Sequence, residues 1–291
     1  MTEALTQLID LLDLEPIEVN IFRGKNLDET RQRVFGGQVA AQSLVAAGRT
    51  VDVGRVHSLH SYLLRPGDPT VPILYEVDRI RDGRSFTTRR VVAIQHGRAI
   101  FNLQCSFHRD EAPGLVHQAE MPEVPRPDEL QTVRERLEEF RDRLPEWFLE
   151  DRPRPIDQRF IGNVPWLRTP SQETRQRLWV RADGSLPVDP LLHAAVVTYA
   201  SDMSLIETVL MSHEVNWEDE ATMVASLDHC MWFHRALRAD RWLLFDQESP
   251  SAYGARGIAR GLVFDEEGHL VVSMVQEGLI RVKTHGPPRA S

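Results

Sequence analysis

The sequence predicts an α+β protein of two tandem halves, each with a central helix wrapped by an antiparallel β-sheet, and with the two sheets joined edge to edge. Three observations support this prediction. The chain has 291 residues, of which 42% are hydrophobic, and this is enough for a large buried core. The order of helix-like and strand-like runs in residues 20–108 returns in residues 156–284. The runs end in turns such as "RPGD" and "RDGR", which suit antiparallel strands because parallel strands need crossover helices.

The first half, residues 1–110, is expected to begin with an acidic amphipathic helix, "MTEALTQLIDLLDLEPIEV". A strand-like run, "EVNIFRG", follows it. After the loop "VFGGQ" we expect a helix rich in small residues, "QVAAQSLVAAGRTV". The half ends with three strand-like runs, "VHSLHSYLLRPG", "PILYEVDRIRDGRSFTTRRVVAIQ" and "AIFNLQCSFH".

Residues 111–155 are expected to connect the two halves. This segment is rich in proline and charge, and its middle is helical in pattern and bounded by prolines. Four apolar residues recur at spacings of three and four, which places them on the inward face of this helix: Leu137, Phe140, Leu144 and Trp147.

The second half, residues 156–291, repeats the order of the first. Its runs are "PIDQRFIG", "RLWVRADG", "DPLLHAAVVTYASDMSLIETVLMSH" as the central helix, "MVASLDHCMWFHRAL", "RWLLFDQESPSAYGARGIARGLVF" and "LVVSMVQEGLIRV". Ser58 aligns with Ser226 at an offset of 168, and Ser85 aligns with Ala252 at an offset of 167. A repeat of this length indicates duplication of a whole domain, because solenoid repeats are only about 20–50 residues long.

Charge and cysteine content limit the partners and the compartment. The 34 Lys and Arg against 43 Asp and Glu give a net charge of −9, which argues against broad binding to nucleic acid or to an anionic membrane. Cys105 and Cys230 lie in apolar strand-like runs, so we expect no disulfide framework. The first residues lack the pattern of a signal peptide, and no apolar run is long enough to span a membrane. We therefore expect a cytoplasmic protein without membrane insertion.

The motifs resemble the bacterial acyl-CoA thioesterase II (TesB) family, whose fold is a double hotdog. The resemblance covers nearly the whole chain, and "FGGQ", "YASDMSL", "SLDHCMWFHR" and "VQEGLIR" stand in the family's order. It implies hydrolysis of acyl-CoA thioesters without a metal or organic cofactor. It also implies a homo-oligomer, either a dimer or a tetramer.

The resemblance further implies a catalytic trio of an Asp on the second central helix, a Thr or Ser on the following strand and a Gln on the last strand. In this chain these positions are Asp202, Ser226 and Gln276. The family often has Thr where this chain has Ser226. Serine keeps the hydroxyl but lacks the methyl group that restrains χ1.

The run "MVASLDHCMWFHRAL" raises the question of a compact Ser–His–Asp triad. If residues 223–233 form one extended strand, Ser226 and His229 point to opposite faces, so such a triad is disfavoured unless a bulge intervenes. His57 and His60 face apart for the same reason, and we expect no metal site. The remaining interpretation is that these polar residues belong to a pocket built from separated elements.

Thioester hydrolysis requires an activated water and donors for the oxyanion. We expect Asp202 to be the general base, with Ser226 and Gln276 orienting the water, and backbone N–H groups near a helix N-terminus stabilising the oxyanion. The substrate is expected to contact the glycine-rich turn and one arginine from each half: Gly36, Gly37, Gln38, Arg89 and Arg256.

Several alternatives stay open. The scaffold could bind acyl-CoA without hydrolysing it, or it could hydrate an enoyl-CoA with an Asp–His pair, for which only Asp228 and His229 are adjacent. Asp228 is a rival acid that could instead anchor a turn or pair with Arg235. His229 could be a hydrogen-bonded core histidine, and Asp202 could be a helix cap.

Overall fold

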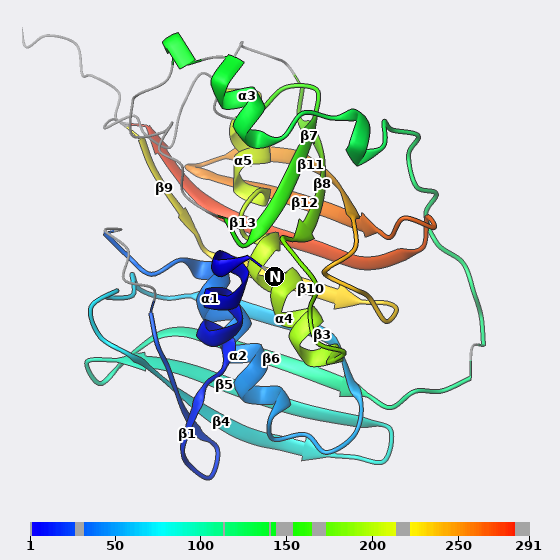
Figure 1. Cartoon of the computed structure of the whole chain (residues 1–291). Helices are drawn as coiled ribbons and strands as arrows, with labels where there is room; N and C mark the ends of the chain where they lie inside the picture. Colours follow the sequence, from blue (N-terminus) through cyan, green and yellow to red (C-terminus); the bar gives the residue numbers. More distant parts are fainter. Residues whose placement is uncertain are drawn as a thin grey trace, which may run out of the picture.

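A single thirteen-stranded antiparallel sheet runs through both halves and curves around the central helices (Figure 1). The computed structural model describes residues 2–26, 32–112, 114–139, 141–143, 154–164, 173–213 and 222–282. Within these residues the strand order is β1-β2-β4-β5-β6-β3-β10-β13-β12-β11-β8-β7, and β9 pairs with β13. The predicted α+β architecture is confirmed. The domain boundaries at 110 and 155 stay a prediction.

The first half follows the predicted order with one difference at its start. Its elements are α1 (Glu3–Leu12), β1 (Glu15–Glu18), β2 (Ile21–Gly24), α2 (Gly36–Gly48), β3 (Arg55–Leu63), β4 (Ile73–Asp82), β5 (Phe86–Gln95) and β6 (Arg98–His108). The first helix buries Leu5, Leu8 and Leu12 on one face, but it ends before Pro16. Proline cannot continue a helix, and residues 15–18 form an edge strand instead of the expected last turn.

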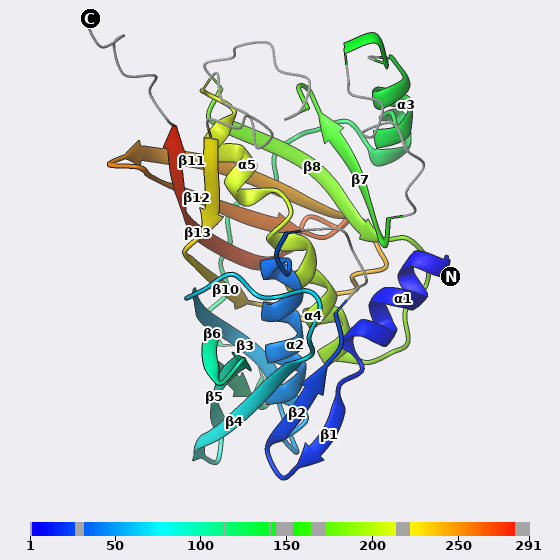
Figure 2. The same cartoon turned by 90° about the vertical axis from the view of Figure 1, so that its left-hand side faces the viewer.

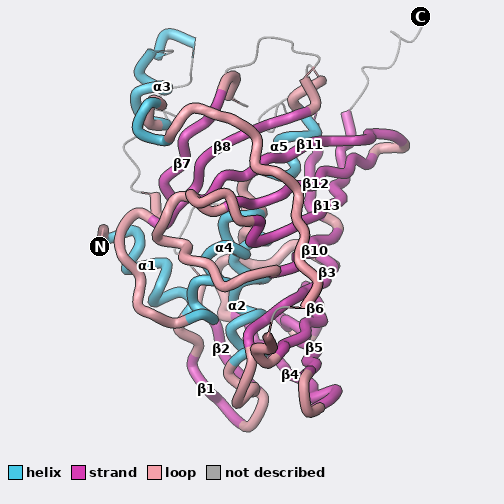
Figure 3. Tube along the Cα trace, turned by 90° about the vertical axis from the view of Figure 1, so that its right-hand side faces the viewer, coloured by secondary structure: helices cyan, strands magenta, loops and turns pink. Residues whose placement is uncertain are grey.

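The connector packs across the outer face of the second half's sheet (Figure 3). Met121, Val124 and Leu130 pack against a small cluster that includes Trp179, whose indole N–H donates to Pro125 O at 2.9 Å. The predicted helix is present as α3 (Val133–Glu139), flanked by the short 3₁₀ turns η1 (Pro127–Glu129) and η2 (Arg141–Arg143).

Of the four apolar residues predicted to face inward from that helix, Leu137 is buried. Phe140, Leu144 and Trp147 lie outside the part of the chain that can be described.

The second half contains β7 (Ile156–Ile161), β8 (Arg175–Ala182), α4 (Pro190–Ser201), α5 (Leu205–Leu210), β9 (Thr222–Ser226), β10 (Asp228–Phe233), β11 (Leu243–Tyr253), β12 (Arg256–Phe264) and β13 (Leu270–Val282). Its sheet joins that of the first half through β3 and β10, where Leu59 lies opposite Met231. Leu59 and Met231 are fully buried, so the junction is part of the core. Among the described helices, none has the length and apolar character needed to cross a bilayer.

The predicted single strand over residues 223–233 is wrong, because a β-bulge divides it at Leu227. Ser226 lies opposite Gly278 and Cys230 lies opposite Val275, so four steps on one strand match three on β13. Leu227 N–H donates to Glu277 O and Leu227 O accepts from Leu63 N–H, both at 2.9 Å. The extra residue reverses the alternation, and the expectation that Ser226 and His229 point apart fails: both reach the end of helix α4.

Helices α2 and α4 lie side by side inside the curved sheet (Figure 2). Small residues such as Ala40 and Ala41 on α2 are buried and let the two helices approach closely. One close contact is at Gly48, where an added Cβ would lie 2.5 Å from side-chain carbons of Leu191. This contact therefore holds the end of α2 against the start of α4.

We expect Gly48→Ala to lower the free energy of unfolding by about 1 kcal/mol or less, because the terminal methyl groups of the half-buried Leu191 must move aside. In a Leu191→Ala background the same substitution should cost clearly less. Urea denaturation of the four proteins measures this coupling. Equal effects of Gly48→Ala in both backgrounds would contradict the close contact.

Candidate active site

Asp202 lies where the central helix of the second half is interrupted. The sequence predicted one helix over residues 189–213, whereas α4 ends at Ser201 and α5 starts at Leu205. Asp202 is the C-cap residue of α4, with φ −77° and ψ −5°, and Met203 N–H donates to Ala200 O. Residues 202–204 form a turn. This turn directs the Asp202 side chain toward the first half rather than along a continuous helix surface.

The structure brings the predicted trio together at this carboxylate. Ser226 Oγ donates to Asp202 Oδ1 at 3.2 Å, and Gln276 Nε2 donates to the same oxygen. The three residues come from the helix break, from β9 at the bulge and from the middle of β13. Gly37 N–H, at the start of α2 in the first half, also donates to the Asp202 carboxylate. The carboxylate therefore receives hydrogen bonds from both halves.

Burial sets the acidity of this group. It raises the pKa of Asp202 to about 6, while the hydrogen bonds from Gln276, Ser226 and Gly37 and the nearby positive charge of Arg33 act in the opposite direction. A carboxylic acid with this pKa is ionised above neutral pH and yet remains basic enough to accept a proton from water. This balance is what a general base requires.

Gln276 presents a free acceptor at the same place. Its side chain is fully buried, its Nε2 is used by Asp202, and its Oε1 has no hydrogen-bond partner. Buried amide oxygens are normally paired with protein or with water, and an unpaired one needs an explanation. A bound water beside Asp202 would explain it.

The glycine pair of "FGGQ" lies against the carboxylate. A Cβ on Gly36 would lie 2.8 Å from Asp202 Oδ2, and a Cβ on Gly37 would lie 2.6 Å from Tyr199 O. Only glycine lets the N-terminus of α2 approach this closely, and the N–H of the buried Gly37 faces the negative charge of Asp202. The structure therefore brings two more of the predicted residues to the site.

Gln38 and Arg89 have other partners. Gln38 is buried and donates to Lys25 O at 3.2 Å and to Asn26 Oδ1 at 2.9 Å. Arg89 is 1% exposed, and its donors are taken by Thr50, Asp82 and two backbone carbonyls, those of residues 81 and 88. A guanidinium has five N–H donors, and none is left here for a phosphate. We assign both side chains to the fold.

Arg256 is exposed and forms an ion pair with Glu277 at 3.3 Å. Its neighbour Gly257 faces the helices, so Arg256 lies on the outer face of the sheet, away from Asp202. The phosphate contact proposed for Arg256 could therefore form only from the outer face.

The rival residues Asp228 and His229 are both used structurally. Asp228 Oδ1 accepts from Glu277 N–H at 2.8 Å, which stabilises the bulge, and no ion pair with Arg235 is found among the described residues. His229 is buried, and its Nε2 lies 2.8 Å from Ser201 Oγ. Burial lowers the pKa of His229 to about 4, so it is neutral at pH 7. Asp228 and His229 do not pair with each other, and no compact Ser–His–Asp triad forms.

Sequence reasoning missed Arg33. Its Nη2 donates to Val224 O at 2.7 Å, which links the segment before α2 to strand β9 beside Ser226. Its charge lowers the pKa of Asp202. The position of Arg33 three residues before "GGQ" was the available signal, but its contact across 191 residues cannot be read from spacing.

One group of described side chains could hold a metal ion: Asp265, Glu267 and His269, in the turn between β12 and β13. Asp265 Oδ1 already accepts the N–H groups of Glu267 and His269, as in an ordinary acidic turn. The turn lies at the opposite end of β13 from Gly278, which pairs with Ser226. It has no part in the site at Asp202.

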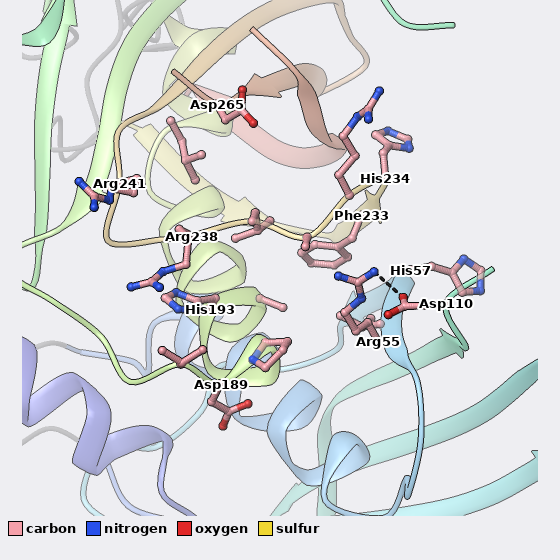
Figure 4. Close-up of a pocket in the computed structure, with 18 of the residues that line it drawn as sticks. Arg55, His57, Asp110, Asp189, His193, Phe233, His234, Arg238, Arg241 and Asp265 are labelled. Carbon is pink, nitrogen blue, oxygen red and sulfur yellow. Dashed lines mark hydrogen bonds and ion pairs between the residues drawn. The ribbon is translucent and has the colours of Figure 1, made fainter. Parts of the chain in front are cut away.

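A separate cavity of about 760 Å³ opens at the N-terminal end of α4 (Figure 4). In this view Arg55 pairs with Asp110 on one side, and His193 and Arg238 lie on the other. Its lining mixes arginines with the carboxylates of Asp189, Asp265 and Glu267, so it has no clear preference for anions. The twelve residues of α4 separate it by about 18 Å from Asp202. The trio therefore does not belong to this cavity.

Comparisons with known proteins agree on one family. The family model described as "Acyl-CoA thioesterase N-terminal domain" matches residues 26–108, and the model described as "Acyl-CoA thioesterase" matches residues 139–279. Acyl-coenzyme A thioesterase 8 of Homo sapiens is 40% identical over 284 residues, which cover 94% of this chain and 88% of that protein.

Two solved structures are similar over nearly the whole chain. The acyl-CoA thioesterase II TesB2 from Mycobacterium marinum has a TM-score of 0.79 and 43% identity, and the match covers 96% of this chain and all of that one. A hot dog fold protein of unknown function from Alicyclobacillus acidocaldarius has a TM-score of 0.77 at 19% identity, covering 98% of this chain and all of that one. The second likeness concerns the fold alone.

Proposed function

Because the chain belongs to the acyl-CoA thioesterase family, we propose that a water molecule activated by Asp202 is the nucleophile of its reaction. The chain is an acyl-CoA thioesterase with a hotdog fold, as the sequence motifs predicted, and it hydrolyses acyl-CoA to a free acid and coenzyme A. The observation that carries the proposal is the convergence of Ser226 Oγ and Gln276 Nε2 on one oxygen of a buried carboxylate.

In the proposed reaction Asp202 accepts a proton from the water as its oxygen attacks the thioester carbonyl carbon. Gln276 Oε1, which is buried and unpaired, accepts a hydrogen bond from the second O–H of the water, and that hydrogen stays with the product acid, while Ser226 keeps the carboxylate in orientation. The tetrahedral intermediate then expels the sulfur of coenzyme A, and the proton held by Asp202 passes to the thiolate. Every group in this sequence returns to its starting state.

The oxyanion is proposed to lie at the N-terminus of α2. Gly36 and Gly37 bring backbone N–H groups next to Asp202, and a helix N-terminus carries partial positive charge. Gly37 N–H donates to Asp202 in the resting site and becomes available to the oxyanion as the carboxylate takes up the water proton and loses its charge. Arg33 adds a full positive charge near the same place.

Two alternatives are less favoured by these contacts. A hydratase would need an Asp–His or Glu–His pair at the site, but His229 is bonded to Ser201 and Asp228 to a backbone N–H. A protein that only binds acyl-CoA would have no need for a buried carboxylate with three donors and an unpaired amide oxygen beside it.

We expect Asp202→Asn to lower kcat about 100- to 10,000-fold, because the amide cannot accept the water proton. Release of free thiol from a saturated acyl-CoA, followed with a thiol reagent, measures this. Asp228→Asn is the matched control: it changes a partly buried carboxylate two residues from Ser226, and it should keep most of the activity. Turnover of Asp202→Asn near that of the wild type would exclude Asp202 as the base.

The rate should depend on pH through the same carboxylate. Burial raises the pKa of Asp202 to about 6, and only the ionised form is a base. We therefore expect kcat/KM to be constant above neutral pH and to fall about tenfold per pH unit well below pH 6. A profile that stays flat down to pH 4.5, where Asp202 would be largely protonated, would contradict the assignment.

The acyl group is proposed to be a fatty acyl chain, and the protein is proposed to act in the lipid metabolism of the cytoplasm. The core around α2 and α4 is strongly apolar, and neither cysteine is paired. Cys105 is buried and Cys230 is half-buried, as expected for thiols in a reducing compartment.

The protein is also proposed to form homo-oligomers through the outer face of the sheet. Tyr62 and Leu74 expose 59% and 42% of their surface there, although both lie within strands. Light scattering after gel filtration should therefore give a mass of two or four chains. A single species with the mass of one chain would contradict this proposal.

A further inference from the structure

The turn that carries Asp202 is held from two sides by buried side chains. Ser201 precedes Asp202 and Ser204 follows it by two residues, and both serines are 0–1% exposed. Each hydroxyl is bonded to a buried polar side chain from a different strand: His229 of β10 for Ser201, and Gln247 of β11 for Ser204. Neither His229 nor Gln247 has a hydrogen bond to the carboxylate itself.

The other contacts of Ser201 indicate the direction of its hydrogen bond with His229. Ser201 Oγ carries one proton and donates it to Thr198 O at 2.9 Å. His229 Nε2 lies 2.8 Å from the same oxygen, so we assign the proton to Nε2 and the histidine as donor. The backbone oxygen of His229 in turn accepts from Ser61 Oγ at 2.8 Å, which ties this residue to the first half. The end of α4 is thereby fixed relative to the junction strands.

Gln247 fixes the other end of the turn. Its Nε2 donates to Ser204 Oγ at 2.7 Å, and its Oε1 accepts from Thr208 Oγ1 at 2.9 Å. Ser204 is the residue before α5, and Thr208 lies in the first turns of that helix. All three side chains are nearly inaccessible to water. One amide therefore fixes both the start of α5 and the turn before it.

The first half has a comparable buried bond but no interruption. Helix α2 runs unbroken to Gly48, and its Gln42 Oε1 accepts from Tyr75 Oη at 2.6 Å. This bond joins a central helix to a strand, as the Gln247 bond does, but it holds no helix break and no carboxylate. It provides a matched internal control.

We propose that His229 and Gln247 are positioning residues for the thioesterase reaction, which hold the α4–α5 turn so that Asp202 meets Ser226, Gln276 and Gly37 at hydrogen-bonding distance. This inference rests on the proposed function. Backbone bonds from Met203 N–H to Ala200 O and from Thr208 N–H to Ser204 O close the two ends of the turn, but they do not connect it to the sheet that carries Ser226 and Gln276. The two side-chain bonds make that connection, and a displacement of about 1 Å at a catalytic group can lower the rate 100-fold.

The test compares His229→Leu, which has no donor, with His229→Gln, which can donate from an amide nitrogen. We expect His229→Leu to lower kcat about 10- to 100-fold with KM changed less than about threefold, and His229→Gln to restore most of the loss. Ser201→Ala removes the acceptor of the His229 bond with only a small change in side-chain volume. It should lower kcat in the same way, and it replaces His229→Leu as the test variant if that protein folds poorly.

A second readout separates positioning from general stability. Among the described residues, the groups that face Asp202 are the positive charge of Arg33 and the donors of Gln276, Ser226 and Gly37. If the carboxylate moves away from these donors, its pKa rises, and the lower inflection of the kcat/KM profile moves to higher pH in His229→Leu and Gln247→Met. Tyr75→Phe should lower Tm but leave kcat, KM and the pH profile unchanged.

A kcat and a pH profile of His229→Leu and Gln247→Met equal to those of the wild type would overturn the inference. It would also be overturned if Tyr75→Phe shifted the profile by the same amount. Asp202→Asn separates failure of the proposed function from failure of the positioning role. If Asp202→Asn keeps full turnover, the proposed function fails. If Asp202→Asn is inactive while His229→Leu is fully active, only the positioning role of His229 is refuted.

Discussion

The structure depends on keeping the Asp202 carboxylate away from bulk water while it remains able to ionise. Burying a carboxylate is costly unless donors replace its water, and here the donors come from α2, β9 and β13. Gly37 belongs to the first half, whereas Ser226 and Gln276 belong to the second. The site therefore exists only where the two halves meet, and the pairing of β3 with β10 is needed for chemistry as well as for folding.

The two duplicated halves contribute different groups to the site. The helix of the first half starts with Gly36 and Gly37 and runs unbroken to Gly48, where the packed Leu191 leaves no room for another side chain. The helix of the second half breaks after Ser201 and presents a carboxylate. One copy thus supplies backbone donors at a helix start, and the other supplies the base at a helix end. This explains why a chain with two similar halves has one such trio.

Alternation and spacing in the sequence were sufficient for the sheet and the repeat, whereas the trio was implied by the resemblance to the TesB family. The sequence was insufficient for Arg89, whose charge suggested a phosphate contact although Thr50 and Asp82 use its donors within the core. It also missed the helix break, since residues 202–204 contain neither glycine nor proline, and the link between Arg33 and Val224 across 191 residues. Bonds between distant segments leave no periodic signal in one sequence.

The bulge at Leu227 shows how one residue changes the chemistry of a strand. In a regular strand Ser226 and His229 would lie on opposite faces, and only one of them could reach the helix end. The extra residue turns both inward, to Asp202 and to Ser201. Asp228 is then left at the bulge, where it accepts the N–H of Glu277, the residue that follows Gln276. Ser226, Asp228 and His229 of "SLDH" thus make three separate contacts, which connect this segment to the end of α4 and to β13. The three residues have the side chains of a catalytic triad, but they do not act on one another.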